Sequence, residues 1–338
     1  MRFDGKIAIV VPVGPPHERF VRCLQSCQRL KDGNFVIVVV SDSPIEICES
    51  FDAINVVSGS TVMTGPAVKR DLAFDRVWAD LYAFLDDDAY VESDWLERVR
   101  RVVAANPTVA AFGGPGLMPD DQTFFEELSA ATMESHIGGG PLNFRFRKKV
   151  RRFCDDFPAF NLFVRREWLE RVGGWASSIY GGEDTFLCAK IHAERGEILY
   201  DPSLFVRHYR RSLVPYHSWQ VYNIGRSRGC FMREGQKTSL KAFYFAPLVF
   251  SVTLTALVVL SVLPSRVQFV SVMTLITAFL AIAAFDGGDD HPLAVRLALP
   301  IGVAVQHAAY AYGLLVGLLS GRRNTTSEGA RPRNRSEG

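Results

Sequence analysis

Three adjacent aspartates, Asp86, Asp87 and Asp88, directly follow the apolar run Leu81–Leu85. Adjacent carboxylates repel one another, and a bound cation would neutralise that repulsion. Oxygen ligands suit Mg²⁺ or Mn²⁺, which bind through one or two carboxylates together with the phosphates of a substrate. On a strand, residues i and i+2 point to the same side, so Asp86 and Asp88 would hold the cation together. The alternative is a solvated acidic turn that caps the next helix.

Two further acidic positions could take part in chemistry. Asp42 ends the apolar run Phe35–Val40, where it could accept a hydrogen bond from a nucleotide base or ribose, or form a turn with Ser43 and Pro44. Glu183 and Asp184 follow two glycines and open a predicted helix. A carboxylate there could act as a general base on an acceptor hydroxyl, although acidic residues also favour the first turn of any helix.

Basic side chains accompany these carboxylates along the chain. His208 lies in the stretch VRHYRRS beside Arg210 and Arg211, whose guanidinium groups suit diphosphate oxygens. A lone histidine is more often structural than a ligand. Lys69 and Arg70 form a second basic pair on a predicted helix, for which an ordinary solvated face is the alternative.

Alternating strands and helices must position these groups. Apolar runs predict strands at Ile7–Val13, Phe35–Val40, Ile54–Val57 and Leu81–Leu85, with helices over 17–31 and 66–79. Further on, residues 159–173 predict a strand passing into a helix, Gly181 to about His192 a helix, and Asp201–His208 a strand-like stretch. Strands that are apolar throughout indicate a mostly parallel α/β sheet covered on both faces. Ligands bind beyond the carboxyl ends of such strands, where Asp42 and the aspartate triplet lie.

The bulk composition narrows the class of partner. The 338 residues carry a formal net charge of +2, so nothing global favours nucleic acid. The six cysteines form no CxxC pair, which indicates reduced thiols in a cytosolic environment. The N-terminal apolar run is short and lacks a cleavage site, so we expect a first strand and no signal peptide.

The C-terminal third predicts a membrane anchor. Apolar segments at 243–263, 267–285 and 293–319 approach or exceed the roughly 20 residues that cross a bilayer, which gives two to three transmembrane helices over 243–319. The third contains Arg296, Pro300 and His307 and is the weakest candidate; one segment could instead be re-entrant, since three crossings would place the basic tail outside.

The flanks of the apolar segments predict an orientation. Arginines and lysines before the first segment place the soluble domain in the cytoplasm by the positive-inside tendency. We therefore expect a multi-pass protein of the cytoplasmic membrane. Residues 216–242 are aromatic and basic and predict an interfacial amphipathic segment, and residues 320–338 predict a disordered basic tail.

Taken in order along the chain, these motifs resemble the family 2 glycosyltransferases, which have the GT-A fold. The resemblance covers about residues 5–212. It rests on the opening strand IAIVVPVG, the aspartate at 42, the DxD motif within FLDDDAYVESDWLE, and VGGW followed by GED at 182–184. The family carries a basic residue followed by Asn on a helix, and here Lys69-Arg70-Asp71 has Asp in place of that Asn.

The resemblance implies a Rossmann-like, mostly parallel GT-A domain over 1–215 that binds a nucleotide-sugar donor. Asp86 and Asp88 would hold the metal and diphosphate with support from His208, and Asp42 would contact the nucleotide base. Asp184 becomes the expected base, with Glu183 in reserve. The remaining residues expected to bind the donor are Lys69, Arg70, Asp87, Arg210 and Arg211.

The family's processive members carry a Q/RxxRW signature, and the region HSWQVYNIGRSRGCF lacks it. We therefore expect inverting transfer of one sugar per encounter to a hydroxyl of a lipid-linked or cell-envelope glycan acceptor, at a membrane whose lipids are also partners. Three alternatives stay open: a polyprenyl-phosphate sugar synthase, a degenerate membrane scaffold of the same fold, and a nucleotidyltransferase that would release pyrophosphate.

Overall fold

The computed structural model describes residues 3–31, 33–42, 54–58, 65–176, 181–261, 266–286 and 290–320. These residues form two compact units. The first contains residues 3–119 and 147–209, and the second contains residues 120–146 and 210–320.

The first unit is built on an eight-stranded sheet with the order β3-β2-β1-β4-β9-β6-β10-β8. Strand β9 runs antiparallel to β4 and β6, and β8 runs antiparallel to β10. The other pairings described are parallel, which confirms the expected mostly parallel α/β sheet. The strands are β1 Ile7–Val13, β2 Phe35–Ser41, β3 Ile54–Ser58, β4 Leu81–Leu85, β6 Ala111–Gly113, β8 Arg152–Cys154, β9 Asn161–Arg165 and β10 Ile198–Tyr200.

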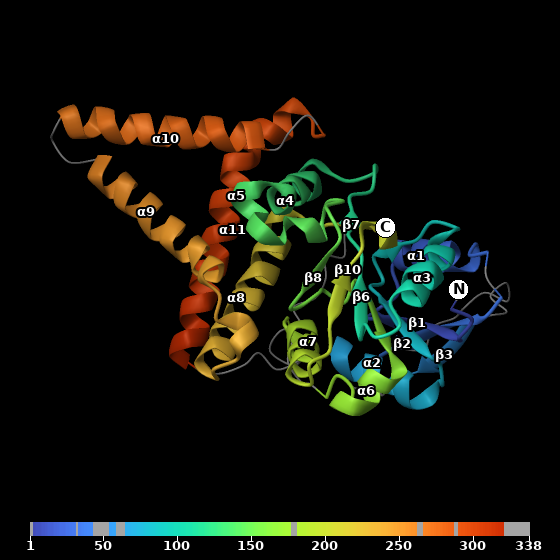
Figure 1. Ribbon diagram of the computed structural model, residues 1–338. Coiled ribbons are helices and arrows are strands. Elements are labelled where there is room, and N and C mark those ends of the chain that lie inside the picture. Colours follow the sequence, from blue (N-terminus) through green and yellow to red (C-terminus); the bar gives the residue numbers. More distant parts are fainter. Residues whose placement is uncertain are drawn as a thin grey trace. The chain divides into compact units, whose positions relative to one another are not determined.

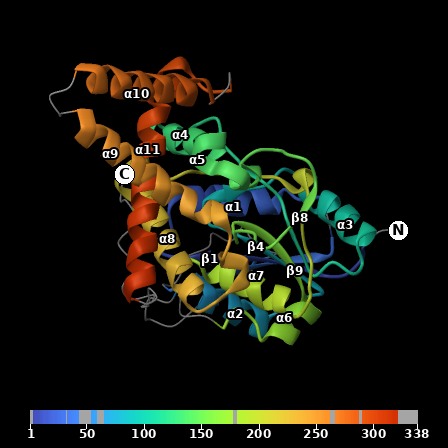
Figure 2. The same ribbon diagram turned by 60° about the vertical axis from the view of Figure 1, so that its left-hand side comes forward.

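Helices cover both faces of this sheet, as the continuous apolar strands require. Helices α1 (Glu18–Gln28) and α3 (Trp95–Ala105) lie on one face, and α2 (Pro66–Arg76), α6 (Arg166–Val172) and α7 (Glu183–Ala193) lie on the other (Figures 1 and 2). Every residue of β1 and β4 is buried in consequence. The four strands predicted between residues 7 and 85 thus begin and end close to the expected positions.

The first unit also contains a small three-stranded sheet, which includes the strand that ends at His208. It has the order β5-β11-β7, with β5 Ala89–Tyr90, β7 Gly116–Leu117 and β11 Val206–His208. Strand β11 pairs antiparallel with β5, so that His208 stands opposite Ala89. The expected strand at Asp201–His208 therefore forms only in its last three residues, after the 3₁₀ turn Pro202–Leu204.

The second unit is helical and combines two distant parts of the chain. Helices α4 (Phe124–Glu134) and α5 (His136–Gly139) and the turn Gly140–Arg145 join the C-terminal helices. Those are α8 Ser218–Arg233, α9 Ala246–Ser261, α10 Arg266–Asp286 and α11 Leu293–Ser320, preceded or separated by short helical turns at Leu213–His217, Lys237–Ser239 and Ala242–Phe245.

Helices α8 and α11 lie side by side along their length (Figures 1 and 2). Each helix places two glycines, four residues apart, at the contact: Gly225 and Gly229 on α8, and Gly313 and Gly317 on α11. A Cβ at Gly229 would stand 2.4 Å from the Leu314 carbonyl oxygen, and one at Gly313 would stand 2.1 Å from the Tyr222 carbonyl oxygen. The two backbones can approach this closely because glycine has no side chain, an arrangement common between helices in membranes.

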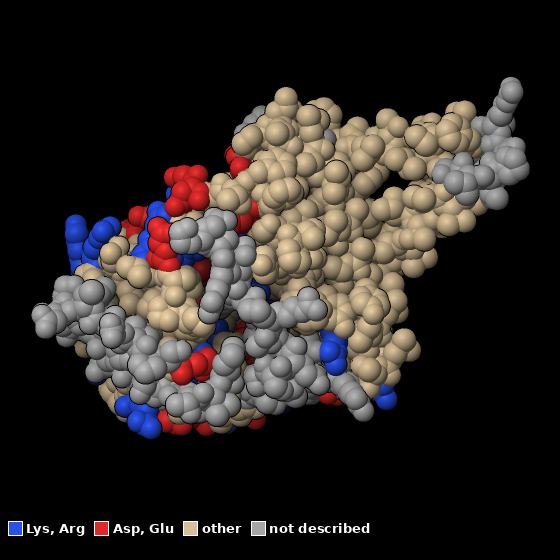
Figure 3. Space-filling view, turned by 180° about the vertical axis from the view of Figure 1, so that it is seen from behind, with Lys and Arg blue, Asp and Glu red and all other residues tan. Residues whose placement is uncertain are grey.

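Two helical stretches of the second unit, Ala242–Leu260 and Leu293–Ser320, are long and apolar enough to cross a bilayer. The middle segment contributes the shorter apolar stretch Val272–Ile282 within the described residues. The surface over α9 and α10 carries almost no charged residue in Figure 3. The segment regarded as the weakest from sequence is thus one of the two candidate spans.

Candidate active site

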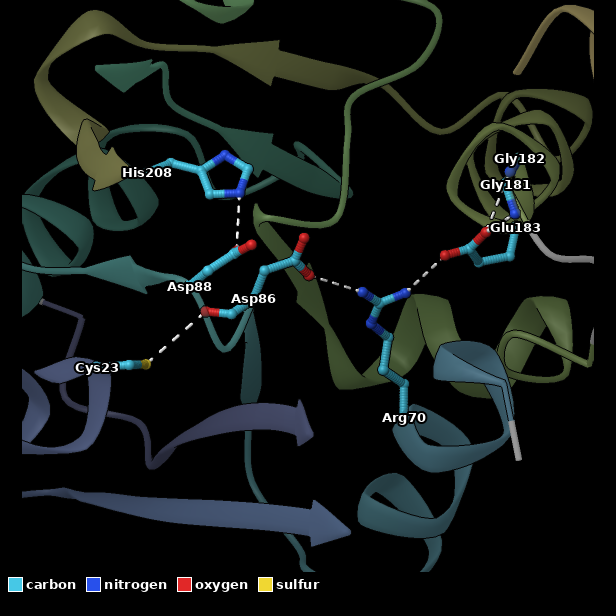
Figure 4. A network of polar contacts seen from close by, with 8 residues as sticks. All are labelled: Cys23, Arg70, Asp86, Asp88, Gly181, Gly182, Glu183 and His208. Carbon is cyan, nitrogen blue, oxygen red and sulfur yellow. Dashed lines mark hydrogen bonds and ion pairs between the residues drawn. The ribbon is translucent and has the colours of Figure 1, made fainter. Parts of the chain in front are cut away.

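A group of three possible metal ligands forms where β4 ends and β11 ends. Asp86, Asp88 and His208 each offer one ligand atom, and these atoms lie within 4.8 Å of one another. The His208 Nε2 atom stands 3.0 Å from Asp88 Oδ1. Two carboxylates and an imidazole at this spacing can hold a divalent cation. The structure therefore brings together the three residues expected from sequence to bind the metal (Figure 4).

The register of the small sheet places His208 in this group. Because His208 pairs with Ala89, it lies next to Asp88, which directly precedes β5, and the Tyr209 amide donates to the Asp88 carbonyl at 3.0 Å. The imidazole stacks on Phe160 with ring centroids 4.7 Å apart. Strand pairing and stacking together fix the orientation of this ligand before any cation binds.

Arg70 joins the metal group to the start of α7. Its Nη2 atom donates to Asp86 Oδ1 at 3.1 Å, and its Nη1 atom donates to Glu183 Oε1 at 3.2 Å (Figure 4). The guanidinium is almost completely buried and lies over the Trp175 ring at 4.6 Å. Arg70 is therefore no part of a solvated face. In this arrangement its two terminal nitrogens contact carboxylates.

Opposing influences act on the Asp86 carboxyl. Burial raises its pKa, and the neighbouring carboxylates of Asp88 and Asp87 raise it further. The charges of Arg70 and His208 act in the opposite direction, but the pKa remains above its ordinary value. A cation at this position would relieve the same repulsion, which is the electrostatic condition expected of a metal site.

Glu183 and Asp184 are neighbours with different surroundings. The second oxygen of Glu183, Oε2, accepts from the amides of Gly181 and Gly182, each at 3.1 Å. Both glycines have positive φ, 76° and 138°, a backbone that other residues rarely adopt. Asp184 Oδ1 accepts from the Thr185 amide at 2.7 Å. Both Glu183 oxygens thus accept hydrogen bonds, one from Arg70 and the other from the two glycine amides.

Lys69 and Asp42 form a pair at the ends of β1 and β2. The Lys69 Nζ atom donates to Asp42 Oδ2 and to the Val13 carbonyl, both at 2.6 Å, and its side chain is buried. The lysine therefore fixes the carboxylate that was expected to contact the nucleotide base.

The middle aspartate of the triplet has a partner that the sequence did not reveal. Asp87 is buried, and its Oδ2 atom lies 3.3 Å from His17 Nε2. The His17 Nδ1 atom accepts from the Phe20 amide at the start of α1, so Nε2 carries the proton and donates to Asp87. Asp87 is therefore tied to α1, while Asp86 and Asp88 belong to the metal group.

Asp71 is a second residue whose role was missed. Its two carboxylate oxygens accept from the amides of Trp175 and Ala176 at 2.7 and 2.8 Å. The departure from Asn was visible in the sequence, but the need for two acceptors was not. A Cβ at Gly174 would stand 2.5 Å from Asp71 Oδ1, which explains the glycine.

The structure groups Arg210 and Arg211 with the second unit. There the Arg210 amide donates to Gln122 Oε1 at 2.6 Å, and its guanidinium lies 4.6 Å from the Phe146 ring centroid. Their expected role at the diphosphate stays a prediction.

Comparisons with known proteins concern the family and the fold of the chain. The profile of glycosyl transferase family 2 matches residues 9–173. Pre-mycofactocin glycosyltransferases of two Mycobacterium tuberculosis strains are each 24% identical over 253 residues, which cover 72% of this chain and 50% of theirs. The chain thus spans about half the length of these curated relatives.

A solved structure is similar over nearly the whole chain. The mannosyltransferase PcManGT from Pyrobaculum calidifontis, determined in complex with GDP-Man and Mn²⁺, has a TM-score of 0.63 at 15% identity and covers 92% of this chain and 87% of its own. This likeness and the sheet order define a GT-A fold. The profile match, the curated relatives and the fold together support a family 2 glycosyltransferase.

Proposed function

We propose that this protein is a metal-dependent, inverting glycosyltransferase that moves one sugar from a nucleotide-sugar donor to a hydroxyl of a lipid-linked or cell-envelope glycan acceptor. The grouping of Asp86, Asp88 and His208 within 4.8 Å carries the proposal. The family match supports it, because the matched region contains the same aspartates.

The donor set fits a divalent cation. Asp86, Asp88 and His208 would hold it, and the imidazole favours Mn²⁺ over Mg²⁺, which prefers oxygen ligands. When bound, such a cation supplies positive charge that stabilises the departing nucleoside diphosphate. The related solved structure contains GDP-Man and Mn²⁺, so GDP-Man is one donor to test.

Asp184 is the proposed general base. It takes the proton of the acceptor hydroxyl while that oxygen bonds to the anomeric carbon, and the bond from this carbon to the diphosphate oxygen breaks on the opposite face. The proton ends on the Asp184 carboxyl, and the electron pair leaves with the nucleoside diphosphate. Glu183 is the reserve candidate. Its two oxygens already accept hydrogen bonds, one from Arg70 and the other from the Gly181 and Gly182 amides.

The other residues bind and position the donor in this proposal. Asp42, held by Lys69, contacts the nucleotide base, and Arg210 and Arg211 contact the diphosphate. Asp87 supports the aspartate triplet through His17, and Arg70 holds Asp86 in place.

We also propose an anchored topology. Residues 1–215 are the catalytic domain, facing the cytoplasm; residues 216–242 lie at the membrane surface; two to three helices over 243–319 cross the cytoplasmic membrane; and 320–338 form a basic tail. The two apolar stretches Ala242–Leu260 and Leu293–Ser320 support this topology.

The test is release of nucleoside diphosphate by the full chain in lipid nanodiscs, with UDP-, GDP- and dTDP-sugars and a membrane lipid extract as the acceptor source. We expect release that requires Mn²⁺ or Mg²⁺ and falls by roughly 10²–10⁴ in kcat in Asp184→Asn. A larger loss of kcat in Glu183→Gln than in Asp184→Asn would assign the role of general base to Glu183. If both variants kept full turnover onto a polyprenyl phosphate, the synthase alternative would replace this proposal. Pyrophosphate as the product would indicate a nucleotidyltransferase.

A further inference from the structure

One edge of the main sheet carries a strongly basic, exposed strip that the proposed transfer reaction does not use. We call residues 147–153 the basic edge. Five of the six residues at 147–152 are lysine or arginine. The segment leads into β8, which is the last strand in the sheet order. Two apolar side chains interrupt the charges: Val150 is 78% exposed and Phe153 is 59% exposed.

The basic edge is a built surface. The Tyr200 hydroxyl donates to the Arg147 carbonyl at 3.0 Å and accepts from the Lys149 amide at 3.0 Å. Strand β8 then pairs with β10, with Phe153 opposite Leu199. One side chain of the sheet thus fixes the backbone from which the lysines and arginines project.

Two cations outside the basic edge, Arg98 on α3 and Arg207 on β11, reinforce its positive charge. The Lys148 Nζ atom lies 3.7 Å from the centroid of the Phe205 ring, and the Arg98 guanidinium carbon lies 4.2 Å from it. Burial lowers the pKa of Lys148, and the charges of Arg98 and Arg207 lower it further. Among the described residues, the acidic groups near these cations include Asp94 beside Arg98, Asp201 beside Arg151, and Glu92.

Exposed apolar side chains between cations match one class of surface. Cations attract the anionic headgroups of a bilayer, and aliphatic or aromatic side chains enter the boundary between headgroups and acyl chains. A face that served only to keep the protein soluble would gain nothing from exposing Val150 and Phe153. Binding of a polyanion that has no apolar layer would also leave Val150 and Phe153 exposed to water.

We propose that the basic edge binds the anionic lipids of the membrane to which the chain is anchored. This inference rests on the proposed membrane association and not on sugar transfer. A tether of candidate spans keeps the face near the bilayer, so that a contact too weak to hold a free protein becomes effective. The lipid composition then governs how the catalytic unit meets the membrane surface.

Hydrogen–deuterium exchange of the full chain in nanodiscs tests this proposal. We compare discs of phosphatidylcholine alone with discs containing about 30% phosphatidylglycerol, and expect exchange at 147–153 to slow on the order of tenfold in the anionic discs. Raising the salt to about 0.5 M should abolish the difference, because screening shortens the reach of these charges. The Lys148→Glu/Lys149→Glu double variant should also lose it.

The matched control is Arg29→Glu/Lys31→Glu, which makes the same change of charge at exposed positions of the same unit. It should keep the anionic-lipid effect. The variant Phe153→Ser keeps every charge and should reduce the effect several-fold. Unchanged exchange at all other peptides checks that each variant is folded.

Equal exchange at 147–153 in both kinds of disc would overturn the proposal, as would an equal loss in the control variant. Slowing by heparin in phosphatidylcholine discs, without any effect of anionic lipid, would assign the strip to an acidic polymer instead. Flotation with phosphatidylcholine vesicles separately tests whether the chain associates with membranes at all. Donor binding separately tests the transferase proposal.

Discussion

The buried guanidinium of Arg70 and the partly exposed carboxylate of Asp86 form an ion pair 3.1 Å long between α2 and the end of β4. The same guanidinium reaches Glu183 at the start of α7, and the next residue, Asp71, holds the Trp175 and Ala176 amides. Two neighbouring residues of α2 thus connect the metal group with the segments on either side of residues 177–180. Disturbing α2 should therefore alter both metal binding and the position of the proposed base.

Arg70→Met should destabilise the first unit by about 3 kcal/mol, because it leaves the buried Glu183 and the partly exposed Asp86 carboxylates without their shared cation. Chemical denaturation followed by fluorescence of the buried tryptophans measures this loss. Arg76→Met is the matched control, since Arg76 is an exposed arginine on the same helix. An equal, small effect of both variants would show that the Arg70 bridge contributes nothing to stability.

Asp71→Asn should cost about 1–2 kcal/mol, although Asn is the residue usual in the family. An amide has one acceptor oxygen, so the Trp175 or Ala176 amide would face an NH₂ group. Thermal unfolding and kcat of the variant measure the effect, with Asp75→Asn, exposed one turn later, as the control. Wild-type stability together with wild-type kcat in Asp71→Asn would contradict the assigned role.

The helical unit should be less stable at alkaline pH. His291 is buried between Glu127 and Glu134, with its ring nitrogens 3.4 Å from each carboxylate. Burial alone would lower its pKa, but the hydrogen bonds and charges of Glu134 and Glu127 raise it overall. The imidazolium therefore stabilises the fold fully below the unfolded pKa of about 6.5, and this stabilisation is lost as the pH rises through the higher folded value.

Exchange protection of α4 in detergent, followed between pH 5.5 and 9, should show this loss, and His291→Gln should remove the pH dependence. His192→Gln changes an exposed histidine and serves as the control. Protection that is constant over the range in the wild-type chain would contradict the prediction.

The main sheet could be predicted because its strands are buried on both faces and are therefore apolar throughout. Ile7–Val13 and Leu81–Leu85 form strands with the expected bounds. The joining of residues 120–146 to the C-terminal helices could not be predicted, since it depends on packing between segments far apart in the chain. The same holds for β9, whose antiparallel direction leaves no mark in an apolar run.

The grouping of Asp86, Asp88 and His208 could also be predicted, because the two aspartates follow β4 and His208 ends β11. What the sequence could not supply was the partner of each side chain. Lys69 and Arg70 look like a solvated pair in the sequence, yet both are buried against carboxylates. His17 belongs to no motif in the sequence. Its contact with Asp87 follows from the position of the start of α1 in the fold.

Metal-dependent binding of a nucleotide-sugar is the decisive test of the proposed site at Asp86, Asp88 and His208. The full chain in detergent is titrated with UDP-, GDP- and dTDP-sugars, with and without Mn²⁺ or Mg²⁺, and its thermal unfolding is followed. We expect that one nucleotide class raises the unfolding temperature only with metal, and that Asp88→Asn and His208→Gln lose this shift while Asp75→Asn keeps it. A folded wild-type chain that shows no shift with any donor and metal, or an undiminished shift in Asp88→Asn, would contradict this proposal.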